Sequence, residues 1–241
     1  MASTGCSRHK QAKLSAPPLP SISEAQPVPP AKTAPVPPRR KPAEPEEDAD
    51  VFLVSPDAQP ISSETGIASW YGPPYHNRRG SNGEIYNMHA LTAAHRTLPL
   101  GSIVRVTNLK TGNSTLVRIT DRGPFIEGRI VDLSLAAAKK VDVWQAGLAK
   151  VRVDVLKTPA SIESGGKWAV QIGAFENEHA ASKLVGHLSR KYRTAKVLSF
   201  PSPTGDWWVR IRVKDDDKQR AQEVAQTTQT NEGAVFLVRL D

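Results

Sequence analysis

The stretch SIVRVTNLKTGNSTLVRIT, residues 102–120, indicates most directly how this chain folds. Its two ends, SIVRVTN (102–108) and STLVRIT (114–120), alternate apolar and polar side chains, which is the pattern of a strand with one buried face. The segment LKTGN between them contains Gly112 and has the length of a hairpin loop. The stretch therefore predicts a β-hairpin.

The flanking sequence extends this β pattern over residues 66–156. GRIVDLS (128–134) and LAKVRVDVL (148–156) are further expected strands. Ser134 is a suitable N-cap for the Ala-rich segment that follows it, so we expect one short helix there. Many short strands, one helix and long irregular loops predict a small closed barrel.

The pattern changes after KTPASIESGG (157–166), which we interpret as a linker. KWAVQIGAF, TAKVLSF, DWWVRIRV and GAVFLVRL are expected strands, and apolar residues at 180, 184, 188 and 192 mark one face of a helix. A second helix is expected in DDDKQRAQEVAQTTQT. The order β-α-β-β-α-β is that of a ferredoxin-like domain, in which helices cover one face of a four-stranded sheet and leave the other free to bind.

The first sixty residues lack the apolar content to build a core. They hold 13 of the 20 prolines, so we expect a disordered, extended tether, with an SH3-type ligand in PVPPRR as the alternative. Basic and acidic residues number seven each in this segment, and the net charge of +8 therefore lies in the rest of the chain. That charge suggests nucleic acid, anionic lipid or an anionic polymer as partner, or serves solubility.

The chain has one cysteine, Cys6, which excludes an internal disulfide and a zinc site built on several cysteines. No apolar run reaches the roughly 20 residues of a membrane-spanning helix, and no signal-peptide core precedes Cys6. STGCS followed by a Pro-rich tether is nevertheless typical of the start of a mature bacterial lipoprotein. Cys6 is therefore either a lipidated residue or an ordinary exposed thiol.

Three ionisable residues stand at turns of the expected barrel. Glu84 follows a turn-forming Asn-Gly pair, His95 follows Thr-Ala-Ala, and Asp121 closes a strand. Desolvation at a barrel rim raises the pKa of a carboxyl such as Asp121, whereas the neighbouring Arg122 lowers it. A carboxyl kept protonated near neutral pH can donate a proton to a glycosidic oxygen. The structural alternatives are a capped turn for Asp121, a surface acid for Glu84 and a core histidine for His95.

The motifs of both domains together resemble one known bacterial family. GIASWYG, NGEIYNMHALTAAHRTLPLGSIVRVTN, RITDRGPF and GRIVDLSLAAAKKV are similar to the double-psi β-barrel domain of rare lipoprotein A, a septal-ring lytic transglycosylase, and WAVQIGAF resembles the start of a SPOR domain. The resemblance implies a tether with a lipidated Cys6 at 1–65, a catalytic barrel at 66–156, a linker at 157–165 and a glycan-binding SPOR domain at 166–241.

The catalytic residues of that family match this chain position by position. Its Glu in Gly-Glu-x-Tyr falls on Glu84, its His after Thr-Ala-Ala on His95, and its Asp before Arg-Gly-Pro on Asp121. Two positions depart from the family pattern, because Thr120 replaces the usual Asn and Asn87 the usual Asp. Thr120 adjoins the expected acid, which puts the hydrogen bonding of that acid in doubt.

The resemblance implies cleavage of the bond between N-acetylmuramic acid and N-acetylglucosamine without water, through attack of the C6 hydroxyl on C1 to leave a 1,6-anhydro ring. We expect Asp121 to act first as acid and then as base, Glu84 to stabilise positive charge, and His95 to orient a carboxylate or the substrate. An exchange of roles between the two acids stays open. The alternatives are a hydrolase, with Asp121 paired to Glu84 or to the otherwise structural Asp132, and a non-catalytic, expansin-like loosening module.

Sugar contacts are expected in both domains. Tyr71 and Tyr75 are expected to be exposed, and Trp70 to pack in the core. The expected substrate-binding residues are Tyr71, Tyr75 and Arg122 in the barrel and Gln171, Trp208, Arg210 and Arg212 on the open sheet face of the second domain. RNA binding by that sheet is disfavoured, because WAVQIGAF and WWVRIRV lack the required aromatic signature.

The resemblance also implies partners and a location. Peptidoglycan strands stripped of stem peptides are the expected ligand of the SPOR domain, and division-site proteins are further possible partners. Neither nucleic acid, a cofactor nor a metal is expected. The expected location is the periplasmic side of the cell envelope, lipid-anchored in the outer membrane and enriched at the division septum.

Overall fold

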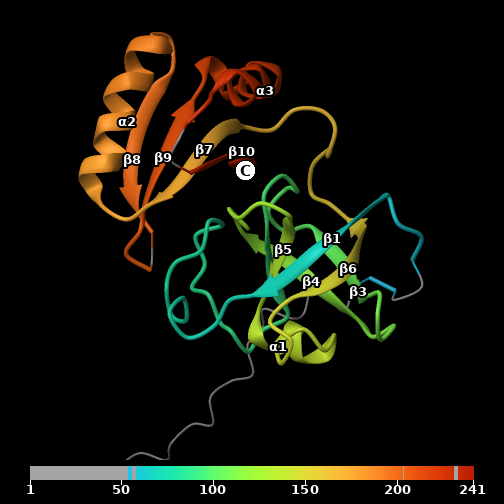
Figure 1. Ribbon diagram of the computed structural model, residues 1–241. Helices are drawn as coiled ribbons and strands as arrows, with labels where there is room; N and C mark the ends of the chain where they lie inside the picture. Colours follow the sequence, from blue (N-terminus) through green and yellow to red (C-terminus); the bar gives the residue numbers. More distant parts are fainter. Residues whose placement is uncertain (1–53, 56–57, 203, 231–232) are drawn as a thin grey trace, which may run out of the picture. The chain divides into compact units, whose positions relative to one another are not determined.

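A computed structural model describes residues 54–55, 58–202, 204–230 and 233–241 of the chain. Cys6 and nearly all of the expected tether lie outside these described residues. The described chain forms a β-barrel followed by a mixed α/β domain, and the two are treated separately below (Figure 1). The predicted fold class, a barrel followed by a ferredoxin-like SPOR domain, is confirmed.

Six strands close the barrel in the order β1-β5-β2-β4-β3-β6. The strands are β1 (Ser62–Trp70), β2 (Thr92–His95), β3 (Ile103–Asn108), β4 (Ser114–Asp121), β5 (Arg129–Leu133) and β6 (Ala149–Lys157). Strands β3 and β4 form the hairpin predicted from the opening stretch, with Ile103 opposite Arg118 and Thr107 opposite Ser114. Two pairs are parallel, β1 with β5 and β2 with β4, and the remaining pairs are antiparallel.

Two strands of the barrel differ from expectation. Strand β1 begins at Ser62, four residues before the expected domain start at Gly66, because residues 62–65 pair with residues 152–155 of β6. Strand β2 was not predicted at all. All four of its residues are buried, so the segment lacks the alternation by which a half-exposed strand is recognised.

The barrel interior holds a single apolar core. It is built from inward-facing residues of all six strands together with Ala137, Ala138 and Val141 at and after helix α1 (Leu135–Lys140). The Ser134 hydroxyl accepts a hydrogen bond from the amide of Ala137, which confirms the predicted N-cap. Trp70 packs against this core, as expected.

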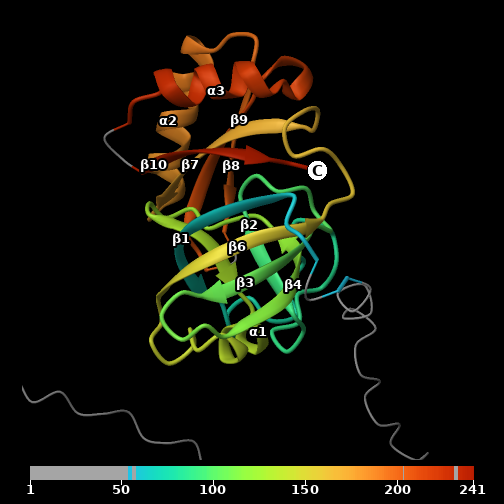
Figure 2. The ribbon, with the colours of Figure 1, turned by 90° about the vertical axis from the view of Figure 1, so that its right-hand side faces the viewer.

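The second domain has the order β7 (Trp168–Phe175), α2 (Glu178–Lys191), β8 (Lys196–Pro201), β9 (Trp207–Arg212), α3 (Lys218–Thr227) and β10 (Ala234–Arg239). A short 3-10 turn, η3 (Lys214–Asp216), precedes α3. The four strands form one sheet in the order β10-β7-β9-β8, which places the first and third strands at the centre (Figure 2). This is the ferredoxin-like arrangement predicted from the order of the elements.

Each helix of this domain begins at a side-chain cap and buries one face. Asn177 caps α2 and Asp217 caps α3, each by accepting a hydrogen bond from an amide in the first turn. Leu188 of α2 and Ala221 of α3 pack with the apolar residues of the central strands, among them Ile172. One sheet face is therefore occupied by helices.

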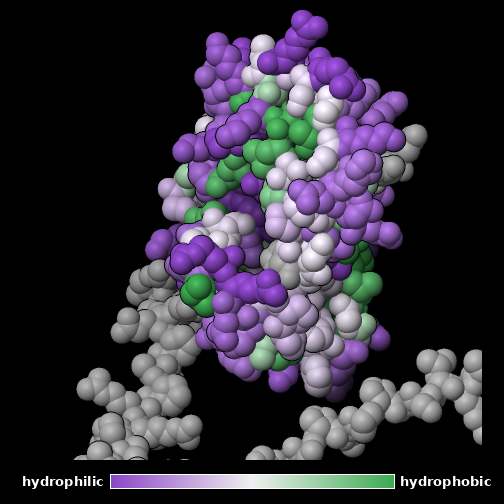
Figure 3. All heavy atoms as spheres, turned by 90° about the vertical axis from the view of Figure 1, so that its left-hand side faces the viewer, coloured by the Kyte–Doolittle hydropathy of each residue, from purple (hydrophilic) through white to green (hydrophobic). Residues whose placement is uncertain are grey.

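Figure 3 shows one face of the molecule, on which polar and charged residues predominate and apolar residues gather in one larger area and a few isolated spots. Within the described ranges, no helix combines the length and the apolar character needed to cross a bilayer.

Candidate functional site

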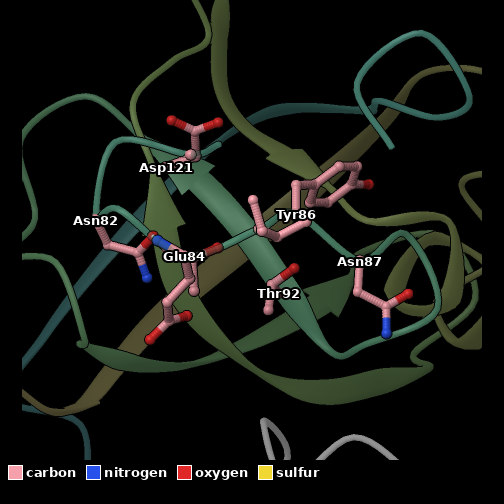
Figure 4. Close-up of a pocket in the computed structure, with 9 residues that line it drawn as sticks. Asn82, Glu84, Tyr86, Asn87, Thr92 and Asp121 are labelled. Atoms are coloured by element: carbon pink, nitrogen blue, oxygen red, sulfur yellow. The ribbon is translucent and has the colours of Figure 1, made fainter. Parts of the chain in front are cut away.

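A narrow pocket opens at one rim of the barrel, where the loop of residues 80–87 meets the start of β2 and the end of β4 (Figure 4). Its lining residues are Gly80, Asn82, Glu84, Ile85, Tyr86, Asn87, Thr92, Thr120 and Asp121. The structure thus brings Glu84 and Asp121 together, as well as both positions that depart from the family pattern. The cavity volume of about 10 Å³ is about the least that can hold one water molecule, so a single small group can enter it.

The loop that carries Glu84 is held by its own hydrogen bonds. The amide of Gly80 donates to the carbonyl of Glu84 at 2.8 Å, and the amide of Glu84 donates to the side chain of Asn82 at 3.0 Å. Gly83 has a φ of 89°, a conformation that side chains with a Cβ rarely adopt. No atom lies within 4 Å of the position of its missing Cβ, so the turn, and not crowding, requires glycine.

Asp121 is anchored through one carboxylate oxygen only. Oδ1 accepts hydrogen bonds from the amide of Ser81 at 2.9 Å, from the Ser81 hydroxyl and from the amide of Arg122 at 2.7 Å. Oδ2 makes no hydrogen bond to any described residue. The capped turn that was the structural alternative is therefore present, and it leaves one oxygen of the acid available to the pocket.

Glu84 is held through both of its oxygens. The guanidinium of Arg118 donates to Oε1 at 3.1 Å and to Oε2 at 2.9 Å, a bidentate pair. The hydrogen bonds from Arg118 lower the pKa of Glu84, although burial opposes the shift. Glu84 is therefore a carboxylate at neutral pH. In Figure 4 the carboxyl groups of Glu84 and Asp121 point in different directions.

His95 is a buried residue outside the pocket. Its ring is 4% exposed, Nδ1 accepts hydrogen bonds from the amides of Thr97 and Leu98, and Nε2 lies 3.2 Å from Oε2 of Glu64. Because Nδ1 is an acceptor, the proton of the neutral ring is on Nε2 and is donated to Glu64. Burial lowers the pKa of His95, although Glu64 opposes the shift. The carboxylate that His95 orients is thus Glu64, which lies in β1.

Asp132, the other acid considered for a hydrolase pair, is largely buried beside the barrel wall. Its oxygens accept hydrogen bonds from the Ser69 hydroxyl at 2.6 Å and from the Arg129 guanidinium at 3.1 Å. Its partners are therefore side chains of the barrel, as suits a structural residue. Burial raises the pKa of Asp132, against the opposing charge of Arg129. The residue does not line the pocket.

The aromatic residues near the rim pack on one another. Tyr71 stacks on Tyr86, with ring centroids 4.3 Å apart and an interplanar angle of 20°, and Tyr75 meets Tyr71 edge-on. The Tyr86 hydroxyl donates to the carbonyl of Tyr71 at 2.7 Å. The expectation that Tyr71 and Tyr75 are exposed is wrong, because both are half-buried and one face of Tyr71 is covered. Any sugar contact through their rings stays a prediction.

Arg122 is buried, not presented to a ligand. Its guanidinium donates to the carbonyls of His95 and Leu98. Burial lowers the pKa of Arg122 to about 10, so it remains charged at neutral pH. These hydrogen bonds to main chain hold the side chain inward, and contact between Arg122 and the substrate stays a prediction.

Three of the four predicted sugar-contact residues of the second domain are paired with other side chains, and the fourth, Trp208, lies on the same sheet face as Arg210. Gln171 is 2% exposed and accepts hydrogen bonds from Arg210, which lies directly opposite it across β7 and β9. Arg212 pairs with Asp216. Trp208 is half-buried on the same sheet face as Arg210, whereas Trp207 packs against the helix-covered core, as strand alternation predicts.

No group of three His, Cys, Asp or Glu residues within the described ranges is placed to hold a metal ion. Glu84 pairs with Arg118 at the pocket, and Glu64 pairs with His95 outside it.

Several residues of the site were not found by sequence reasoning. Arg118 and Thr92 sit in strands whose apolar neighbours suggested only packing, and Ser81 precedes the Asn-Gly turn without any motif of its own. Within STLVRIT, Arg118 stands between the apolar Val117 and Ile119, so alternation turns its side chain to the opposite face of the strand. A charged residue at that position was the one local signal for Arg118.

Comparisons with known proteins agree with this geometry. Residues 63–153 match the family model described as "Lytic transglycolase", and residues 164–238 match the SPOR domain model. These are the two domains, in the order expected for one family. In both domains the chain is similar to the rare lipoprotein A family.

Curated members of the rare lipoprotein A family from three bacteria are similar to the chain. The protein named "Endolytic peptidoglycan transglycosylase RlpA" of Vibrio cholerae is 58% identical over 147 residues, covering 58% of this chain and 54% of that protein. Those of Helicobacter pylori and Campylobacter jejuni, which carry the same name, are each 42% identical, covering 55% and 56% of this chain and 51% and 56% of their own lengths. The chain thus spans about half the length of the curated relatives it matches.

Proposed function

We propose that this protein is an endolytic peptidoglycan transglycosylase, and that the pocket at the barrel rim is its active site. The observation that carries the proposal is a pocket with one carboxylate oxygen of Asp121 unpaired beside the ionised Glu84. The match of residues 63–153 to the lytic transglycolase family model supports the same reaction. The expected substrate is the bond between N-acetylmuramic acid and N-acetylglucosamine, and the expected product carries a 1,6-anhydro ring.

Asp121 is the residue best placed to move protons. The reaction requires one group to protonate the glycosidic oxygen as the bond to C1 breaks, and then to take the proton from the C6 hydroxyl as it attacks C1. A carboxyl can perform both steps in sequence. Anchoring through Oδ1 fixes the side chain, and the unpaired Oδ2 is the atom that would give and receive the proton.

Glu84 is suited to the other role. Because Arg118 keeps it ionised, it is a poor proton donor at neutral pH, but its negative charge favours an oxocarbenium-like sugar ring. Of the two assignments left open by the sequence, the structure therefore favours Asp121 as the acid/base and Glu84 as the stabilising charge.

The second domain and the tether would bring the barrel to its substrate. We propose that the SPOR domain binds glycan strands lacking stem peptides and that the protein acts in the cell envelope. A lipid on Cys6, attachment to the outer membrane, enrichment at the septum and contact with division-site proteins belong to the same proposal.

Digestion of purified glycan followed by mass spectrometry tests the function. Release of fragments with anhydro ends is the expected result, reducing ends would identify a hydrolase, and unchanged glycan would identify a binding or loosening module. Glycan with and without stem peptides, digested side by side, tests the preference for stripped strands. Full turnover by the Asp121→Asn variant would remove that residue from the mechanism.

A further inference from the structure

Two arginines next to the pocket have no acidic partner within the described chain. Arg78 and Arg79 are exposed and directly precede Gly80, which lines the pocket. The side chain of Arg78 bonds to no described residue, and that of Arg79 donates only to the carbonyl of Gly83. The six other guanidiniums of the barrel each bond to a carboxylate or to at least two main-chain carbonyls, and they belong to Arg96, Arg105, Arg118, Arg122, Arg129 and Arg152. Two cations beside the pocket are therefore available to a ligand.

These arginines lie on a short hairpin that forms one wall of the pocket. Arg79 is bridged to Ile85 across this hairpin, and residues 84–86 all line the pocket. The hydrogen bond from Arg79 to the carbonyl of Gly83 holds that guanidinium at the turn of the hairpin. We call residues 77–86 the arginine lip. Its position brings positive charge to the edge of the pocket.

The pocket itself is acidic. Among its lining residues, Glu84 and Asp121 carry carboxyl groups and none is basic. Arg118 pairs with Glu84 and makes no contact with Asp121 that would offset its charge. A substrate that carries an anionic group is repelled by these acids unless nearby cations balance them. An unpaired guanidinium suits that task, because its fork of N–H donors matches the two oxygens of a carboxylate.

N-acetylmuramic acid carries such a carboxylate only in stripped strands. Its lactyl group ends in the carboxyl that forms the amide bond to the stem peptide, so removal of the peptide leaves a charged carboxylate. The lactyl group is attached to the same ring as the C1 that reacts. A glycan that places C1 beside Asp121 therefore holds this carboxylate within the breadth of one sugar ring from the pocket, where the arginine lip lies.

We propose that Arg78 and Arg79 bind the free lactyl carboxylate of N-acetylmuramic acid, so that the barrel as well as the second domain selects strands without stem peptides. A stem peptide replaces the charged carboxylate by a neutral amide and thereby removes the contact. The inference rests on the proposed function of the pocket, and it names two specificity-determining residues for that function.

Two matched glycans test the proposal with the full-length protein. Stripped glycan with free lactyl carboxylates is compared with the same glycan after carbodiimide coupling to methylamine, which makes each carboxylate a small neutral amide. The wild type should cleave the first with a kcat/KM about tenfold higher, the value of one charge-assisted hydrogen bond. The double variant Arg78→Gln/Arg79→Gln should cleave both glycans equally.

The matched control removes two positive charges far from the pocket. Lys110 and Lys150 are exposed and lie at the opposite end of β4 from Asp121, where the amide of Leu109 donates to the carbonyl of Lys150. The double variant Lys110→Gln/Lys150→Gln should keep the wild-type preference for the free carboxylate. Loss of the preference in this control would show that it depends on net charge and not on the arginine lip.

The ratio between the two glycans separates recognition from support of the loop. If Arg79 only braces the turn at Gly83, the arginine double variant loses activity on both glycans alike and keeps their ratio, which would overturn the inference. A wild type without any preference would also overturn it. Raising the salt concentration from about 0.05 M to about 0.5 M should reduce the wild-type preference, because exposed charges are screened. A preference that salt leaves unchanged would contradict an ionic contact.

Binding measured without turnover keeps this question apart from the reaction. Short stripped glycan fragments are titrated calorimetrically into full-length Asp121→Asn and into the same chain with both arginines changed to Gln. Both chains carry the same second domain, so a difference in affinity reports the barrel. We expect the arginine changes to weaken binding of the free carboxylate form and to leave binding of the methylamide form unchanged. Equal affinities for the free carboxylate form would overturn the inference. Absence of glycan cleavage by the wild type would refute the proposed reaction, while these titrations would still decide on the arginine lip.

Discussion

The barrel pocket and the sheet face of the second domain differ in whether their polar side chains have hydrogen-bond partners. At the pocket, one oxygen of Asp121 has no partner within the described chain. On the sheet face, Gln171 and Arg210 bond to one another. Unpaired groups in a shielded site are costly to the fold and are retained where a ligand or a reaction uses them, whereas paired groups already stabilise the domain.

The same difference in pairing distinguishes Asp121, which we propose to exchange protons, from Glu84 and His95. Glu84 has both oxygens on Arg118, and His95 has both nitrogens occupied, so each side chain is held through both of its polar atoms. Asp121 alone among the three family positions keeps a free oxygen. We therefore expect substitution of the residue with an unpaired polar atom to lower turnover more than substitution of the fully paired residues.

The largest effect is expected at Asp121. The Asp121→Asn variant keeps an acceptor oxygen for Ser81 and Arg122 but cannot exchange a proton, so turnover should fall by about 10²–10⁴-fold, the usual contribution of a general acid–base group. Release of anhydro fragments measures it, and the exposed Glu127→Gln serves as control. Turnover of Asp121→Asn equal to that of the control would contradict the contrast.

A smaller loss is expected for the Glu84–Arg118 pair. Glu84→Gln removes the charge, and Arg118→Lys keeps a cation but not the bidentate geometry, so we expect turnover to fall by about 10–10²-fold for the first and less for the second. The same assay measures both. A loss for Glu84→Gln larger than that for Asp121→Asn would reverse the assigned roles.

The contribution of the Glu84–Arg118 pair to stability should decrease as the pH is lowered. The folded pKa of Glu84 is lowered from 4.5, so its contribution to stability is complete above pH 4.5 and is lost as the pH falls through the lower folded pKa. The difference in Tm between wild type and Glu84→Gln should therefore shrink on acidification below pH 4.5. A difference that persists or grows there would mean that Arg118 does not hold the carboxylate in solution.

The paired groups of the second domain should matter chiefly for stability. Gln171→Leu leaves the Arg210 guanidinium without its partner, and the free energy of unfolding should fall by about 1.5–3 kcal/mol, as for other hydrogen bonds to charged groups. Asp216→Asn breaks the more exposed pair with Arg212 and should lower it by less than about 1 kcal/mol. Urea unfolding of the full chain compares the two. Equal losses would show that burial does not distinguish these pairs.

The smallest expected effect concerns His95. Its folded pKa lies below the usual 6.5, so the unfolded chain takes up a proton before the folded one does, and stability falls as the pH drops below 6.5. The slope for one such group is at most about 1.4 kcal/mol per pH unit. It should be flatter in His95→Asn than in the wild type, whereas the exposed His179→Asn should keep the wild-type slope.

Local patterns were sufficient for most of the fold. Alternation in β3 and β4, the N-cap at Ser134 and the order of elements after residue 166 each depend on neighbours in sequence, and all were confirmed. Strand β2 escaped because burial on both faces erases alternation. The early start of β1 depends on pairing with β6, which lies about ninety residues further along the chain.

The site was predictable only where a motif marks it. The motifs placed Glu84 and Asp121, which do share a pocket, but the partners that set their chemistry are distant in sequence. Arg118 binds Glu84 across 34 residues, and Glu64 meets His95 across 31. Such contacts follow from the closed barrel and not from any local pattern. The unpaired Oδ2 of Asp121 is harder still, since a lack of partners is visible only in three dimensions.

The pairing of the first and last barrel strands has a mechanical consequence. Ser62 lies opposite Val155 and Ala68 opposite Ala149, so the chain enters and leaves this domain at the same end of one antiparallel ladder. Tension between the segment before Ser62 and the segment after Lys157 would break those hydrogen bonds one after another, like a zipper, instead of loading them all at once. A barrel pulled at both of its chain ends would open first along this seam.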